Sequence, residues 1–124
     1  MNNTFKQVRA MQVKITFHNM DHSDSLEAHV NQKLEKLQEL LKEEELPQNV
    51  EVRLRSGSLH AHHEVEIYLK TKHFNLNVSD EGPEMYQVFD QANESMTKVV
   101  KKEKSKLLDK SHKSRDDKRK FQGN

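Results

Sequence analysis

The sequence contains no cysteine, and none of its apolar runs is long. Without cysteine the protein can form neither disulfides nor thiolate metal sites, which fits a reducing compartment. No apolar run approaches the roughly 20 residues of a membrane span, and residues 1–12 lack the apolar core of a signal peptide. We therefore expect a soluble cytoplasmic protein that makes no contact with membranes.

The motifs of the common enzyme classes are also absent from the sequence. The chain has three glycines and no glycine-rich phosphate loop, nucleophile motif or HExxH. The stretch HAHH at residues 60–63 holds imidazoles, which are ligands for zinc, copper and nickel, but only Glu64 stands beside it at ligand spacing. We interpret this stretch as a polar hairpin loop. We predict a protein that is no enzyme and has no metal, cofactor or small-molecule substrate.

Charge is distributed unevenly along the chain. Residues 1–97 contain ten Lys or Arg and sixteen Asp or Glu, a net charge of −6. Residues 98–124 contain eleven and four, a net charge of +7. An acidic body with a basic arm is typical of proteins that meet nucleic acid. The charge also fits a solvated helix end that keeps the protein soluble, so both interpretations stay open at this point.

Four stretches alternate apolar and polar residues, which is the pattern of half-buried strands. In residues 11–17 the odd-numbered side chains are apolar and the even-numbered ones are polar. The other alternating stretches are residues 49–57, 63–70 and 73–79. Short breaks separate these last three, which predicts an antiparallel meander.

A first stretch of apolar residues at helical spacing follows the first strand. Its spacings of four, four, three and four residues predict a helix over residues 24–44. Ser23 or Asp24 is the expected N-cap, and Asp24 stands three residues before a glutamate, as in a capping box. Pro47 cannot continue the helix and should end it.

A second helix is predicted over residues 83–108, with Pro83 in its first turn. The first half of this stretch has an apolar stripe, whereas the second half is mostly charged and should project beyond the sheet. From residue 109 the periodicity is lost, and we expect residues 109–124 to form a flexible basic tail.

The predicted order β-α-β-β-β-α defines an α+β fold class. Each strand has one apolar face and each helix one apolar stripe, so we expect a four-stranded sheet with both helices packed on one face. The other face should be open to water. We assign residues 1–10 to an N-terminal extension, unless Met11 is the start, and residues 11–108 to the folded domain.

The stretches MQVKITFHNM, KLEKL, DEGPEMYQVFDQ and KKEKSKL stand in an order and at a spacing that point to a known family. They resemble the bacterial ribosome hibernation-promoting factors, also called ribosome-associated inhibitor, protein Y or sigma-54 modulation proteins. The resemblance covers residues 11 to about 108. Its most specific part precedes the lysine-rich helix end and consists of Glu81, Gly82, Met85, Tyr86 and Asp90.

The resemblance implies a fold similar to double-stranded RNA-binding domains and a ribosome-binding role for residues 11–108. The partner it implies is the small ribosomal subunit with its rRNA, in the cleft that holds mRNA and tRNA, and also the whole ribosome. The protein would inhibit translation and preserve inactive ribosomes under stress or in stationary phase. It resembles the short family members, which lack a dimerising domain, and we expect a monomer when it is free. Whether bound ribosomes stay single or pair is left open.

Lysines on both predicted helices are the candidate rRNA-binding residues. The resemblance places them at Lys33 and Lys36 in the first helix and at Lys98, Lys102, Lys104 and Lys106 in the second, and Lys101 widens the second row. A spacing of four residues puts Lys98, Lys102 and Lys106 on one helix face. Ammonium groups there can follow a phosphate backbone and release its counterions without reading sequence. A solubilising helix end is the alternative.

Two further groups of residues have structural alternatives to an RNA-binding role. The open sheet face should hold four secondary rRNA candidates, Lys14, Arg53, Arg55 and Lys70. Glutamates on the same face offer them cross-strand ion pairs instead. Tyr86 could stack on a base, but we favour a mainly structural role for it, with Asp90 on the same helix face. Gly82 should supply backbone freedom at the turn before the helix.

Two other classes of function stay open beside ribosome hibernation. One is a general double-stranded RNA-binding protein, and the other is a protein-interaction module that modulates a transcription factor. Phosphate contacts weaken steeply with salt, so salt-resistant binding without RNA would favour the interaction module. Comparable affinity for free duplex RNA and for small subunits would favour the general RNA binder.

Overall fold

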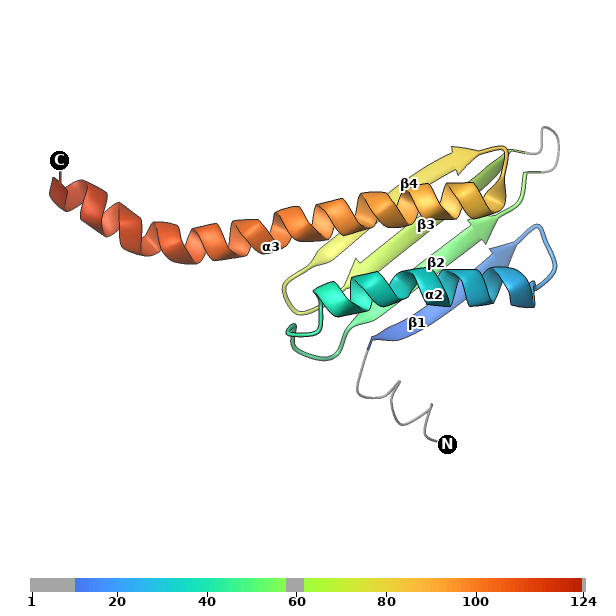
Figure 1. Ribbon diagram of the computed structural model, residues 1–124, viewed down its shortest axis with the longest axis horizontal. Coiled ribbons are helices and arrows are strands. Elements are labelled where there is room, and N and C mark those ends of the chain that lie inside the picture. The colour runs from blue at the N-terminus through green and yellow to red at the C-terminus, as the bar shows by residue number, and fades with distance from the viewer. Residues whose placement is uncertain (1–10, 58–61, 124) are drawn as a thin grey trace.

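Figure 1 shows the computed structural model, which describes residues 11–57 and 62–123 and the side chains as far as residue 108. The elements are β1 (Gln12–His18), α2 (Asp24–Leu40), β2 (Asn49–Arg55), β3 (His63–Lys70), β4 (Asn75–Gly82) and α3 (Met85–Gly123). This order confirms the predicted β-α-β-β-β-α arrangement and the α+β class. The assigned N-terminal extension lies outside the described residues.

The four strands form one sheet in the order β1-β2-β3-β4. β1 and β2 are parallel because α2 crosses over between them, whereas β2, β3 and β4 pair antiparallel and form the predicted meander. The register aligns Lys14, Glu51, Tyr68 and Asn77 in one row across the sheet. Because side chains alternate between the two faces, this row lies on the face opposite the core.

Both helices cover the same face of the sheet, and the other face is open, as predicted (Figure 1). The buried strand residues include Val52 and Ile67, which are fully inaccessible to solvent. They pack in one core with Leu34 of α2 and with Phe89 and Met96 of α3. Burial of each such side chain stabilises the fold by roughly 1.5–3 kcal/mol, so the two periodicities fix which face of every element turns inward.

The start of α2 is set by Ser23, one of the two predicted N-caps. Its side-chain oxygen accepts a hydrogen bond from the backbone N–H of Leu26 at 3.2 Å. Asp24 is the first helical residue, so the predicted capping box with Asp24 as its cap is wrong. The Asp24 carboxylate lies instead in the first turn, where the positive end of the helix dipole favours it.

The end of α2 lies at Leu40, before the predicted residue 44. The acidic run 43–45 stands at the negative end of the helix dipole, where added negative charge is unfavourable. The buried Gln48 side chain donates hydrogen bonds to the carbonyls of Leu41 and Glu44, at 2.8 and 3.0 Å. These contacts stabilise a turn in place of another helical turn.

The helix α3 begins at Met85, so the prediction that Pro83 lies in its first turn is wrong. Glu84 stands between them and caps the helix. Its carboxylate accepts hydrogen bonds from the backbone N–H groups of Tyr86 and Gln87, at 2.6 and 3.2 Å. A carboxylate at this end of a helix satisfies free donors and meets the positive end of the dipole.

The helix α3 continues to Gly123, so the predicted end near residue 108 is wrong. It is about 58 Å long at 1.5 Å per residue and extends well beyond the sheet (Figure 1). Residues 86–122 contain neither proline nor glycine, and Lys, Gln and Arg are good helix formers. The prediction relied on the spacing of apolar residues, which marks only the part of a helix that packs on a core. In the described part of the chain no helix is both long and apolar enough to cross a membrane.

Candidate nucleic-acid interface

A groove of about 620 Å³ lies between α2 and α3 on the helical side of the protein. The residues lining it are Gln32, Lys33, Glu35 and Lys36 of α2 and Asp90, Asn93, Glu94 and Thr97 of α3. Asn93 fixes the spacing, because its side-chain amide donates a hydrogen bond to the carbonyl of Lys33 at 3.2 Å. The structure therefore brings Lys33 and Lys36 against the second helix, in a groove of mixed charge.

The second group of candidate lysines follows the groove along α3. Lys98, Lys101, Lys102 and Lys106 are all exposed. Lys98 meets Glu94 at 3.8 Å and Lys106 meets Glu103 at 3.3 Å, each within the helix. Such exposed pairs contribute little to stability and are screened by salt. Their ammonium groups can therefore exchange a carboxylate for a phosphate at small cost.

Lys104 differs from Lys98 and Lys106 because its ammonium group contacts the other helix, whereas theirs lie beside carboxylates of α3. Its Nζ atom donates a hydrogen bond to the carbonyl oxygen of Leu40 at 2.7 Å. Leu40 is the last residue of α2, whose last turn contains no basic residue of its own. A cation there satisfies a free carbonyl and meets the negative end of the helix dipole. Lys104 therefore joins α3 to the end of α2, a structural role that sequence analysis did not identify.

The arginines of the open sheet face take part in ion pairs. Arg53 donates from Nε to Glu51 at 3.1 Å, and this hydrogen bond holds the pKa of Arg53 above its usual value. Arg55 lies 3.8 Å from Glu64 of the neighbouring strand. The ion-pair alternative is thus present at both arginines, while their rRNA role stays a prediction.

The signature residues Tyr86 and Asp90 both contact His29 of α2. The His29 Nε2 atom lies 2.7 Å from Oδ1 of Asp90. The His29 and Tyr86 rings form a T-shaped pair with 5.0 Å between ring centroids. These contacts support the structural role predicted for both signature residues. His29 itself was missed, because nothing in the sequence around it signals a partner on the other helix.

The other signature residues also have structural roles. Gly82 has no positive φ, so the predicted need for backbone freedom is wrong. A Cβ atom there would lie 3.1 Å from Cγ2 of the buried Val88, a tight contact that favours glycine at this position. Met85 belongs to the core, and Glu81 lies 3.2 Å from His62.

One cluster in the described part of the chain has the donor atoms of a metal site. His22, Asp24 and Glu27 hold one donor atom each within 4.8 Å of one another. Both nitrogens of His22 already face a carboxylate, at 3.3 and 3.4 Å. The cluster is mostly exposed and lies at the positive end of α2, which disfavours a cation. We assign it no metal. In the HAHH stretch, residues 60 and 61 lie outside the described residues.

The fold and the lysines of α2 and α3 define a small α+β domain with a candidate RNA-binding face. Residues 13–108 match the family described as sigma 54 modulation protein / S30EA ribosomal protein. The chain belongs to this family of ribosome-associated proteins, which confirms the resemblance noted in its sequence.

Solved structures show the same fold. The N-terminal domain of Protein Y from Thermus thermophilus has 19% sequence identity and a TM-score of 0.61, over 75% of this chain and 97% of that one. A ribosomal subunit interface protein from Coxiella burnetii has 20% identity and a TM-score of 0.65, over the same shares of the two chains. A search of curated proteins found no match.

Proposed function

We propose that this protein is a hibernation factor that binds the small ribosomal subunit through α2 and α3, in the cleft that holds mRNA and tRNA. Bound there, it inhibits translation and preserves inactive ribosomes under stress or in stationary phase. Its membership of a ribosome-associated family supports the ribosome as partner. The Coxiella relative of the same fold, described as a ribosomal subunit interface protein, is consistent with this partner.

The observation that carries the proposal is the pairing of two lysine-bearing helices on one face. Lys33 and Lys36 line the groove beside α3, and the exposed lysines of α3 continue from the groove along a helix that runs past the sheet (Figure 1). Ammonium groups spaced along one surface bind phosphates by shape and charge and need no base contacts. This suits folded rRNA, whose helices are recognised largely by shape and backbone.

The mechanism needs no chemical step by the protein. A bound domain inhibits by occupying space that mRNA and tRNA require, so its affinity and position determine the effect. We accordingly propose a non-enzymatic role that uses no cofactor. We also propose that residues 11–108 are sufficient to fold and that the end of α3 adds phosphate contacts.

Sedimentation of the protein with purified small subunits, large subunits and whole ribosomes tests this function. We expect comigration with small subunits and whole ribosomes at low salt, loss of binding as salt rises, and a parallel fall in cell-free translation. Failure to comigrate at low salt would overturn the proposal. Equal affinity for free duplex RNA would identify a general RNA binder, and binding that resists salt would identify a protein partner.

A further inference from the structure

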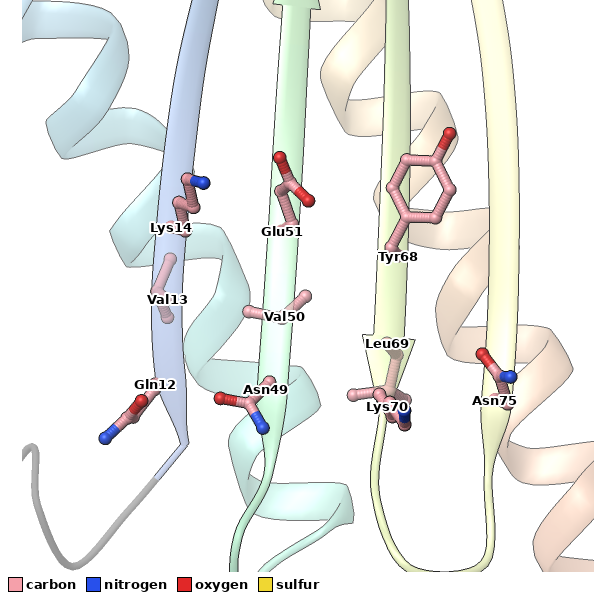
Figure 2. A pocket seen from close by; sticks show the side chains of 10 residues that line it. All are labelled: Gln12, Val13, Lys14, Asn49, Val50, Glu51, Tyr68, Leu69, Lys70 and Asn75. Carbon is pink, nitrogen blue, oxygen red and sulfur yellow. The ribbon is translucent and has the colours of Figure 1, made fainter.

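A second hollow, of about 470 Å³, lies on the open face of the sheet, where β1 and β2 begin. Figure 2 shows the side chains that line it, with the helices behind the sheet; apart from Val13, Val50 and Leu69, they lie in two rows on the open face. One row contains Lys14, Glu51 and Tyr68, and the other contains Gln12, Asn49, Lys70 and Asn75. The hollow is therefore separate from the groove between α2 and α3, on the opposite side of the molecule.

The charges around this hollow favour an anion. Lys14 and Lys70 line it, and neither has an ion-pair partner among the described residues. Glu51, the one carboxylate among the lining residues, already accepts a hydrogen bond from Arg53 at 3.1 Å. The site thus has two lysines available for a ligand, while its carboxylate is neutralised by a residue outside it.

The uncharged side chains favour a planar group with hydrogen-bonding edges. The Arg53 guanidinium lies over the Tyr68 ring at 4.8 Å from its centroid, and the Tyr68 hydroxyl donates to Glu66 at 3.1 Å, which holds the ring in place. Unpaired bases stack on aromatic rings and on guanidinium planes. The side-chain amides of Gln12, Asn49 and Asn75 line the hollow with both donors and acceptors.

We propose that this hollow binds one nucleotide of single-stranded RNA. The base stacks on the Tyr68 ring, which Arg53 contacts from outside the hollow, the amides bond the edge of the base, and Lys14 and Lys70 bind the flanking phosphates. A hollow of about 470 Å³ has the size of a small-ligand site. The inference depends on the proposed function in one respect, namely that the protein binds RNA. It gives the protein two RNA-binding sides, with folded rRNA on the helices and an unpaired strand on the sheet.

The test titrates the full isotope-labelled protein with a short single-stranded RNA and with a duplex of equal length, at a salt concentration that suppresses non-specific binding. We expect the single strand to shift the backbone NMR signals of Lys14, Asn49, Glu51 and Tyr68, and the duplex to leave them in place. Signals that move only on α2 and α3, or that move equally with the duplex, would overturn the inference.

Variants give the test a second readout. Tyr68→Leu keeps apolar volume but removes the ring, and stacking on an aromatic side chain accounts for about 1–3 kcal/mol per base, so we expect single-strand affinity to fall about fivefold to a hundredfold. Tyr68→Phe keeps the ring and loses only its hydrogen bond to Glu66, so it should bind much more tightly than Tyr68→Leu. The double change Lys14→Gln, Lys70→Gln should weaken binding more than its charge-matched control, Lys42→Gln, Lys72→Gln. Equal losses in the two double variants would contradict the site.

The inference and the proposed function fail in different ways. If the hollow binds single-stranded RNA but the protein does not sediment with ribosomes, the proposed ribosomal function is wrong and the proposed RNA site is retained. If the protein binds ribosomes but Tyr68→Leu leaves the affinity for single-stranded RNA unchanged, the proposed RNA site is wrong and the proposed function is retained. If ribosomes protect the amides of the hollow from hydrogen exchange while single-stranded RNA does not shift their signals, another part of the ribosome covers the hollow and the inference is overturned.

Discussion

His29 of α2 and Asp90 of α3 meet with 2.7 Å between Nε2 and Oδ1, and this contact joins the two helices that flank the lysine-lined groove. The Tyr86 ring forms a T-shaped pair with the same imidazole. Two of the residues that best mark the family therefore contact the same histidine and help to hold the two helices together. Together with the hydrogen bond from Asn93 to the Lys33 carbonyl, these contacts set the spacing of the groove that Lys33 and Lys36 line.

The first prediction concerns the contribution of this contact to stability. Asp90→Asn removes the charge with little change of shape and should lower the free energy of unfolding by about 1 kcal/mol, since the pair is part-exposed. Denaturant unfolding measures it. Glu94→Gln is the control, because the exposed Glu94 pairs, among the described residues, only with Lys98 of its own helix, and it should change stability by less than about 0.5 kcal/mol. A double-mutant cycle with His29→Ala that shows no coupling would count against the contact.

The second prediction separates Lys104 from the neighbouring lysines. Lys104→Met keeps the aliphatic stem but leaves the Leu40 carbonyl without its partner, so the free energy of unfolding should fall by about 1 kcal/mol. Lys102→Met, the control on the exposed side of α3, should leave stability within about 0.5 kcal/mol and weaken ribosome binding instead. If the two variants behave alike in both measurements, Lys104 is not a structural lysine.

The third prediction concerns pH. The hydrogen bond to Glu66 raises the pKa of Tyr68 above its usual value of 10.0. Since the folded-state pKa is the higher one, this contribution to stability is present below about pH 10 and is lost as pH rises through the folded pKa. In a Tyr86→Phe background Tyr68 is the one tyrosine left, so ultraviolet absorbance reports its ionisation alone. Glu66→Gln should shift the titration to lower pH.

Glu64→Gln is the matched control for this titration. Glu64 lies on the same open face but pairs with Arg55, so its loss should leave the Tyr68 titration nearly unchanged. A midpoint that is the same in all three proteins would show that Glu66 does not hold the Tyr68 hydroxyl.

The fourth prediction tests the last part of α3. Deleting residues 109–124 removes six basic and three acidic residues and leaves every residue of the described core in place. The shortened protein should unfold as the original does, but bind small subunits more weakly and with a smaller dependence on salt. Unchanged affinity and salt dependence would mean that this segment does not contact RNA.

The strands and the core-facing sides of the two helices could be predicted from sequence, because burial of one face makes apolar residues recur at regular intervals in each element. The alternation in residues 63–70 gave the bounds of β3, and the stripe ending at Leu41 gave the buried face of α2. The second half of α3 could not be predicted in this way, since its sequence is mostly charged and shows no apolar stripe. Its helical backbone follows from helix propensity and from the absence of breakers before Gly123.

The sequence identified the candidate lysines, but it did not identify the contacts that hold the two helices together. The pairs His29–Asp90 and Lys104–Leu40 join residues 61 and 64 positions apart, and no local pattern links residues so distant. Lysine spacing identified a charged helix face without showing that Lys104 turns toward α2. The role of Glu84 as the cap of α3 was likewise hidden by the more conspicuous Pro83.

The most direct test of the central claim compares two charge-matched double variants for binding to small subunits across a salt series. Lys98→Glu with Lys102→Glu reverses two charges on the proposed RNA-binding helix. Lys42→Glu with Lys72→Glu reverses two that already lie 2.9 Å from glutamates. We predict that the first variant loses binding and salt dependence while the second keeps both. Equal behaviour of the two variants would contradict the claim that α3 binds rRNA.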